Sequence, residues 1–210
     1  MTSLLGIDNG LTVTKAVIFD VDGTVLSVAR RRVPQLLPKP HHVERDMDGL
    51  WQATAAAIVE AISLSGRPAH DIAAVAATAH GDGLYLLDAS RRPLGPGILS
   101  LDSRAGGIVS AWADKADAAL ALTGQIPHAS APSALLGWIK QHEPERFAQI
   151  AHILACKDWL RFCLTGQIAT DSTEASTSFA DVQTQTYAPA ALHLFGLETL
   201  ESALPPILSP

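Results

Sequence analysis

Cysteine and aromatic residues are scarce in this chain of 210 residues, which has two cysteines and 5% aromatic residues. The cysteines, Cys156 and Cys163, lie seven positions apart in a segment with helical spacing. We expect them to share one face of a helix and to pack as small hydrophobic side chains. This pattern favours neither a disulfide nor a cysteine-bound metal ion.

Long hydrophobic runs are also missing. Although 48% of the residues are hydrophobic, no run approaches the roughly 20 residues that cross a bilayer. The chain starts directly with a strand-like segment, without the basic stretch, apolar helix and small-residue cleavage site of a secretory leader. The sequence therefore predicts a soluble, cytoplasmic protein that does not contact a membrane.

Lysine is sparse as well, and the net charge is −6. We therefore expect no nucleic-acid partner, and the short run Arg30-Arg31-Arg32 is interpreted as the solvated end of a strand. The length allows one large domain or two small ones, and one domain is the favoured prediction. The sequence leaves the oligomeric state open, with a homo-oligomer as one hypothesis.

The apolar segments that are present predict an α/β fold that opens with three antiparallel strands. Two strands flank a tight turn at Asn9-Gly10, and a second turn over residues 20–24 leads to a third strand that ends near Val33. A helix is predicted over residues 48–64 and a buried parallel strand over 72–78. Farther along, we predict strands at 85–88, 98–101 and 150–155 and helices at 104–112, 132–142 and 159–164. The apolar, proline-rich stretch over residues 204–210 leads us to expect a chain that continues.

The first turn carries the side chains of a phosphate site. A hairpin turn projects backbone N–H groups outward, and these can bind phosphate oxygens. Hydroxyls and a cation can assist, and a carboxylate can hold a magnesium ion through water. The residues in these roles are Gly10, Thr12, Thr14 and Lys15 for phosphate and Asp8 for magnesium. A nucleotide-triphosphate site is one interpretation; an ordinary hairpin with a polar tip is the other.

Several motifs resemble FGGY-family carbohydrate kinases. Residues 130–142 follow that family's first signature at every defined position except one, where Leu135 stands in place of the lysine that most members carry. The segments over 80–88, 143–150 and 203–206 are most similar to pentulose kinases, especially the L-xylulose type. Other matching segments are Gly6-Ile7-Asp8, Ala79-His80-Gly81, Asp102-Ser103-Arg104, residues 142–144, Lys157-Asp158-Trp159-Leu160, residues 164–166 and Thr170-Asp171.

The resemblance implies a ribonuclease H-like fold of the actin-like ATPase type. It implies ATP-dependent phosphorylation of a terminal hydroxyl on an open-chain ketose, a xylulose-type sugar, with ATP and magnesium as cofactors. Residues 1–210 correspond to the N-terminal one of two domains in such kinases. The family's general base and adenosine-binding residues lie beyond this part, so we expect the chain alone to be catalytically inactive.

The same resemblance implies roles for individual residues. Asp8 is the predicted catalytic and metal-binding residue, and Leu11 replaces a threonine common in the phosphate turn. His80, preceded by Ala79, falls where xylulose kinases contact the sugar. Ser130 replaces a sugar-contacting tyrosine of glycerol kinases and Ser100 a tryptophan, which favours a longer and more polar substrate than glycerol.

Asp102 and Arg104 have two interpretations. They either line the sugar cleft or form an ion pair that fixes the loop after Leu101. The sequence leaves both open.

Two other functions compete with the kinase. Residues 18–26 read as the first motif of haloacid-dehalogenase-like phosphatases, with Asp20 as nucleophile and Asp22 as acid/base. That class needs a later lysine and an acidic pair that this sequence lacks at suitable spacing, and aspartate with glycine suits a tight turn for local reasons. A non-catalytic sugar-binding module is the third hypothesis, although it has no use for Asp8, Thr12 and Lys15 together.

Overall fold

The computed structural model describes residues 2–208. They form two compact units. The first unit comprises residues up to 35 together with 45–80, and the second comprises 36–44 together with 81 onward. Each unit buries its own hydrophobic cluster. The sheet of the first unit and the helices of the second each have an apolar face, and such a face must pack against another element.

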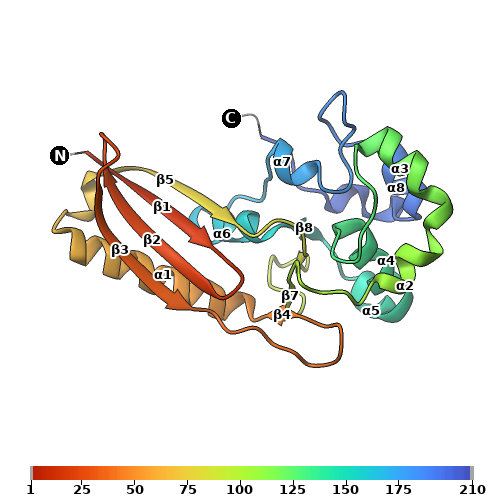
Figure 1. The fold of residues 1–210 in the computed structure, drawn as a ribbon, viewed down its shortest axis with the longest axis horizontal. Coiled ribbons are helices and arrows are strands. Elements are labelled where there is room, and N and C mark those ends of the chain that lie inside the picture. The colour runs from red at the N-terminus through yellow and green to blue at the C-terminus, as the bar shows by residue number, and fades with distance from the viewer. Residues whose placement is uncertain (1, 209–210) are drawn as a thin grey trace. The chain divides into compact units, whose positions relative to one another are not determined.

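The first unit is built on a four-stranded sheet in the order β3-β2-β1-β5 (Figure 1). β1 (Ser3–Asn9), β2 (Val13–Asp20) and β3 (Val25–Arg32) are antiparallel neighbours. β5 (Ile72–Ala79) runs parallel to β1. The predicted antiparallel opening and the parallel direction of the following strand are therefore confirmed. The prediction that this parallel strand is buried is wrong, because β5 lies at the edge of the sheet and its residues are half-buried or exposed, with Val75 48% exposed.

Helix α1 (Met47–Ser65) covers one face of this sheet, close to the predicted 48–64. The Asp46 carboxylate accepts a hydrogen bond from the Asp48 N–H at its start, and Gly66 ends it with φ of 65°. A side-chain oxygen cap and a left-handed glycine are the usual boundaries of a helix. The core between helix and sheet consists of Leu5, Ile7, Ala16, Ile18, Ala29, Ala57 and Ala61.

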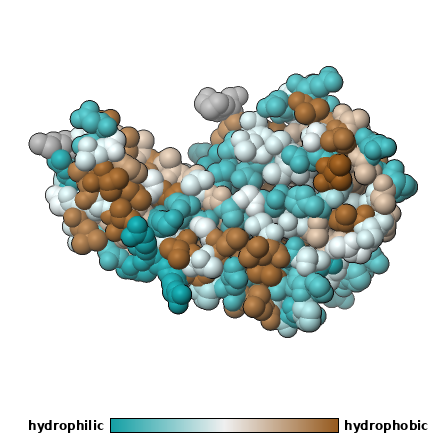
Figure 2. Space-filling view, in the orientation of Figure 1, coloured by the Kyte–Doolittle hydropathy of each residue, from teal (hydrophilic) through white to brown (hydrophobic). Residues whose placement is uncertain are grey.

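The opposite face of the sheet carries an apolar row. The register pairs Leu4 with Phe19 and Phe19 with Val25. Leu5 and Ile18 point toward α1, where they belong to the core. Because side chains alternate between the two faces along a strand, Leu4, Phe19 and Val25 point away from α1. Leu4 is 38% and Val25 52% exposed, and Figure 2 shows apolar residues gathered over the sheet.

The second unit is mainly helical. β6 (Tyr85–Leu87) pairs with β8 (His152–Leu154), and β7 (Gly97–Ile98) pairs with β4 (Glu44–Arg45), whose first residue belongs to this unit. The helices are α2 (Gly106–Ala111), α3 (Ala116–Thr123), α4 (Pro132–His142), α5 (Pro144–Phe147), α6 (Cys156–Thr165), α7 (Ser172–Ala175) and α8 (Pro189–Phe195), with the 3-10 turns η2 (Ala113–Lys115) and η3 (Glu198–Ala203); a further turn, η1 (Ala69–Asp71), lies in the first unit.

Helix α4 occupies the core of the second unit. Ala134, Leu135 and Ile139 are fully buried there, so Leu135, at the position where a lysine is usual, is a core residue. A Cβ on Gly137 would lie 2.8 Å from the Trp112 ring. The glycine therefore lets this helix approach α2 and its following turn closely.

Several boundaries differ from the predictions. The strand predicted at 98–101 is wrong beyond Ile98, because the chain turns there: the Asp102 N–H donates to the Leu99 carbonyl. Helix α6 begins at Cys156 rather than 159, where the Asp158 carboxylate accepts the Ala155 N–H. The alanine-rich α3 and α8 were not predicted, whereas the helix at 132–142 is confirmed.

Two predictions from composition can be compared with the described residues. Cys156 is buried and Cys163 half-buried, and neither forms a disulfide there, in agreement with small packed side chains. Within residues 2–208, none of the helices has the length and apolar character needed to cross a membrane.

Candidate functional site

The candidate phosphate site lies at the turn between β1 and β2. The Gly10 N–H donates to the Val13 carbonyl over 3.0 Å and closes the hairpin. The Thr12 side chain is exposed. It lines an open pocket whose other lining residues include Arg32 and Gln35. The turn is therefore accessible, as a phosphate site requires.

Asp8 and Lys15 flank this turn. The β1–β2 register places them directly opposite each other, and the Lys15 Nζ lies 2.9 Å from the Asp8 Oδ2. Their side chains are 46% and 42% exposed. An accessible carboxylate beside an accessible ammonium group can hold a cation and an anion together, which is the arrangement predicted for metal and phosphate.

Thr14 does not lie where the sequence prediction put it. Its side chain is fully buried, and its hydroxyl lies 3.2 Å from the Thr54 hydroxyl on α1. Alternation along the strand explains this, because Lys15 points to the accessible face and its neighbour must point to the helix. Asn9 shares this buried group through a 3.4 Å bond from its Nδ2 to the Thr54 Oγ1. Thr14 thus holds the sheet to α1 instead of facing a phosphate.

Ala79 and His80 lie beside this turn in the same unit. β5 runs parallel to β1 with Ala79 opposite Asn9, and the His80 N–H donates to the Asn9 carbonyl over 3.0 Å. His80 therefore follows the carboxyl end of one parallel strand, next to the strand end that carries Asp8. Ligands of α/β sheets gather at such carboxyl ends.

The Asp20 turn is built by local hydrogen bonds. The Asp20 Oδ1 accepts the N–H groups of Asp22 at 3.0 Å and Thr24 at 2.8 Å. Asp20 therefore stabilises a tight turn, which is the interpretation that the sequence analysis gave as the alternative to a phosphatase nucleophile. Asp20 also lies at the far end of β2 from the phosphate turn, opposite Ser3.

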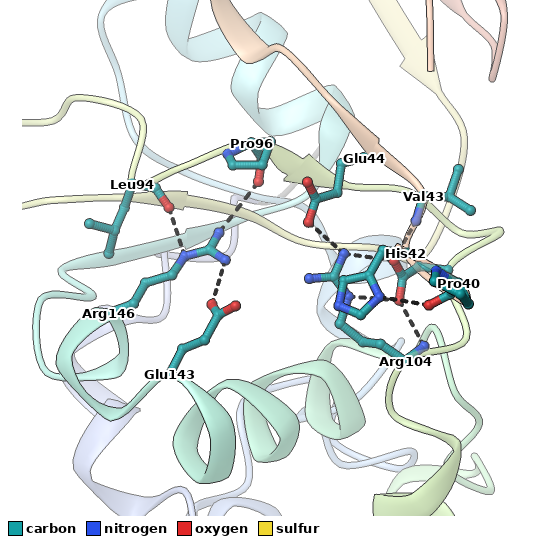
Figure 3. Close-up of polar contacts among 10 residues, drawn as sticks. Pro40, His42, Val43, Glu44, Leu94, Pro96, Arg104, Glu143 and Arg146 are labelled. Atoms are coloured by element: carbon teal, nitrogen blue, oxygen red, sulfur yellow. Dashed lines mark hydrogen bonds and ion pairs between the residues drawn. The ribbon is translucent and has the colours of Figure 1, made fainter. Parts of the chain in front are cut away.

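In the second unit, Asp102 and Arg104 form a buried ion pair. Figure 3 shows the Arg104 side chain beside Glu44. The Arg104 Nε and Nη2 donate to the two Asp102 oxygens at 2.9 and 2.8 Å, and Nη2 also donates to Glu44 at 2.7 Å. The Asp102 Oδ2 accepts the Val43 N–H at 2.7 Å. Burial alone would lower the pKa of Arg104, but the Asp102 and Glu44 carboxylates raise it.

This geometry favours one of the two interpretations offered for the pair. The Asp102 and Arg104 side chains are 0% and 1% exposed, so their polar atoms are occupied in fixing the loop to residues 43–44. A contact of either side chain with sugar stays a prediction.

Ser130 lies at the N-terminal side of α4 and is 9% exposed. Its hydroxyl is 3.3 Å from His128 Nδ1, and its carbonyl accepts the Gly83 N–H at 3.0 Å. His128 Nε2 lies 3.7 Å from the Asp82 carboxylate. Gly83 has φ of 79°, and a Cβ there would meet the Ile98 carbonyl at 2.3 Å. Sequence reasoning singled out Ser130 but assigned no role to His128 and Asp82, which are far apart in the sequence and come together only in the fold.

Sequence reasoning also assigned no role to a partly buried cluster of charged side chains in the second unit. The Lys157 Nζ lies 2.7 Å from Asp171 and 3.3 Å from Asp158. Glu174 and Asp158 line a small cavity of about 40 Å³ beside Tyr187. Burial, opposed by Lys157 and assisted by neighbouring carboxylates, raises the pKa of Glu174 to about 7. Burial also raises the pKa of Asp158. The Lys157-Asp158 and Thr170-Asp171 motifs were the available signal for this cluster.

Comparison with known proteins identifies the family. A model described as "FGGY family of carbohydrate kinases, N-terminal domain" matches residues 3–210. A probable L-xylulose kinase of Haemophilus influenzae is 40% identical over 207 residues, covering 97% of this chain and 43% of the relative. The L-xylulose/3-keto-L-gulonate kinase of Escherichia coli is 37% identical, covering 97% of this chain and 42% of the relative.

Solved structures agree. A xylulose kinase from Rhodospirillum rubrum is 28% identical with a TM-score of 0.91, over 98% of this chain and 42% of that protein. The predicted actin-like ATPase fold class is thereby confirmed. The chain spans less than half the length of both L-xylulose kinase relatives. Because the family model covers nearly the whole chain, this protein belongs to the FGGY family of carbohydrate kinases.

Proposed function

We propose that this chain is the phosphate- and sugar-binding half of an ATP-dependent kinase that phosphorylates a terminal hydroxyl of a xylulose-type ketopentose. The observation that carries the proposal is the juxtaposition of Asp8, Lys15 and the accessible turn with His80 in one compact unit. The L-xylulose kinases similar to this chain favour a ketopentose as substrate.

ATP and magnesium fit the residues at the turn. Magnesium is usually bound by one or two carboxylates together with substrate phosphates, and no group of three or more histidine, cysteine or carboxylate side chains within residues 2–208 could hold a metal ion. Asp8 is the carboxylate we assign to it. When bound, magnesium neutralises charge on the transferring phosphoryl group. Lys15, the Thr12 hydroxyl and turn N–H groups would bind phosphate oxygens.

For the sugar, we propose His80 as the main contact and Ser130 as a second. Their imidazole and hydroxyl groups suit a polyhydroxylated substrate. Phosphoryl transfer depends on positioning and charge neutralisation, and a general base must still accept the hydroxyl proton. We propose that this base and the adenosine site lie in the part of the family's proteins that this chain does not span, and that the isolated chain is inactive. With ATP as the phosphoryl donor, we propose a cytoplasmic reaction.

The test is ¹⁵N NMR titration of the 210-residue chain with Mg-ATP and, separately, with L-xylulose. Mg-ATP is expected to shift the amide signals of residues 8–15, and L-xylulose those around His80. Asp8→Asn should abolish the magnesium-dependent part of the first response. Asp20→Asn, at the other end of β2, removes the same charge and should leave it unchanged.

A coupled assay with ATP, magnesium and L-xylulose completes the test. Robust turnover by this chain alone contradicts its being half of a site. Absence of any response at residues 8–15 refutes the phosphate site itself. Loss of phosphate-ester hydrolysis in Asp20→Asn, if such hydrolysis exists, would instead support the phosphatase.

A further inference from the structure

Arg45 is a buried cation behind the phosphate turn. Its side chain is 1% exposed, and it pairs with no carboxylate among the described residues. Its Nη1 donates to the Gly10 carbonyl at 3.2 Å, and its Nη2 donates to the Leu11 carbonyl. Removing a guanidinium group from water is costly unless its donors are used, so these two carbonyl contacts are the main compensation that the unit offers. Its Nε has no partner in the described part of the chain.

The two carbonyls determine the direction of two N–H groups. In a trans peptide the C=O and N–H bonds point in opposite directions, and no described peptide bond is cis. Holding the Gly10 and Leu11 oxygens toward Arg45 therefore points the Leu11 and Thr12 N–H groups away from it. Neither of these N–H groups donates to an atom within residues 2–208. Successive outward N–H groups form a concave anion site.

Arg45 is itself held firmly. It immediately precedes Asp46, which caps α1, and α1 packs on the sheet through the buried alanines Ala57 and Ala61. Gln35 supports the same contact, since its Nε2 donates to the Leu11 carbonyl at 3.1 Å. The turn is thus clamped from behind by a side chain that the helix start and the sheet core fix in place.

We propose that Arg45 is a positioning residue for the phosphate turn: it holds the Gly10 and Leu11 carbonyls inward so that the Leu11 and Thr12 N–H groups face the phosphate. The inference rests on the proposed function. The charge of Arg45 adds attraction for an anion on the outer side of the turn.

The experiment compares wild type with Arg45→Met, Arg45→Lys and Gln35→Ala in the 210-residue chain, using inorganic tripolyphosphate with magnesium as the probe. Arg45→Met is expected to weaken tripolyphosphate binding about tenfold, the effect of one lost hydrogen bond to a charged group. Arg45→Lys should recover part of it, because an ammonium group can reach one carbonyl. Gln35→Ala, at a half-buried position, should weaken tripolyphosphate binding about twofold. It replaces the Arg45 variants as the test of the clamped turn if those variants do not fold.

Arg67→Met is the matched control. It removes the same charge just beyond the other end of α1, about 28 Å from Arg45 along a helix of 19 residues. Binding should be unchanged. Ligand-free ¹⁵N spectra add a second readout: in Arg45→Met the Leu11 and Thr12 amide signals should move or broaden while the core signals of α1 stay in place.

The outcomes separate the two proposals. Unchanged Leu11 and Thr12 signals and unchanged binding in both Arg45→Met and Gln35→Ala overturn the positioning role and leave the proposed function standing. A uniform change across the whole unit shows a structural role only and also overturns it. If wild type binds no tripolyphosphate, the phosphate site of the proposed function fails, and Arg45 has no anion to position.

Discussion

Replacing Glu174 with glutamine should change how the stability of the second unit depends on pH. Glu174 faces Lys157, Asp158, Asp171 and Asp82, and burial is the largest cause that raises its pKa from 4.5 to about 7. The folded protein therefore keeps a proton on this side chain up to about pH 7, whereas the unfolded chain loses it near pH 4.5. Glutamine is neutral at every pH and cannot show this behaviour.

The sign follows from proton linkage. Between pH 4.5 and about 7 the folded state binds the extra proton, so stability falls as pH rises through this window. The stabilisation is fully present below 4.5 and lost above about 7. The full difference in pKa corresponds to about 3 kcal/mol as an upper limit. Because Glu174 is partly accessible and Lys157 opposes the shift, we expect about 1–2 kcal/mol.

The assay is urea unfolding at pH 5, 6, 7 and 8, followed by tryptophan fluorescence in a Trp51→Phe background. The remaining tryptophans, Trp112, Trp138 and Trp159, all belong to the unit that contains Glu174. The quantity of interest is the free energy of unfolding of Glu174→Gln minus that of its parent. It should rise by about 1–2 kcal/mol from pH 5 to pH 8.

Two features make the result decisive. Burial also lowers the pKa of His152, but His152 is present in both proteins, and its contribution cancels in the difference. Glu145→Gln removes a carboxylate at an exposed position of α5 and should give a difference independent of pH. A pH-independent difference for Glu174→Gln, or one that falls toward pH 8, would refute the reasoning.

Three further predictions concern other buried or paired groups. Asp102→Asn should lower the free energy of unfolding by about 3–5 kcal/mol, because it leaves buried Arg104 without its bidentate partner; a loss under about 1 kcal/mol in urea unfolding would contradict this. Thr54→Val should lower the free energy of unfolding by about 1–3 kcal/mol in thermal or urea unfolding, since Thr14 and Asn9 lose a buried hydroxyl partner, and an unchanged midpoint would argue against it. Asp8→Asn should alter stability by less than about 1 kcal/mol, because its ion pair is exposed, while calorimetry should show the loss of magnesium-dependent tripolyphosphate binding; binding that still depends on magnesium would speak against Asp8 as the metal ligand.

Local patterns predicted much of the first unit. Asn9-Gly10 between apolar segments predicted the hairpin, and the helical spacing with Asp48 and Gly66 predicted α1 within one residue at each end. These features depend on neighbours a few residues away, which a sequence displays directly. The same holds for the Asp20 turn, whose hydrogen bonds stay within five residues.

The second unit was harder to predict because its elements are short and depend on contacts distant in sequence. Residues 99–101 are apolar enough for a strand, yet the chain turns there because the Asp102 carboxylate binds Val43, 59 positions earlier. Alanine-rich segments such as α3 lack a clear apolar stripe, so packing against the core rather than periodicity selects the helix.

By itself, the sequence determined which chemical groups this protein has at its amino-terminal turn, the family to which it belongs and most of its helix and strand order, because these depend on residue type and local spacing. Only the tertiary structure decided that Thr14 faces the core while Lys15 faces solvent, that Asp102 and Arg104 neutralise each other, and that Arg45 reaches the turn carbonyls. The direction of a side chain and its partners depend on strand register and on burial by segments 30 to 60 residues away, and local spacing does not encode either.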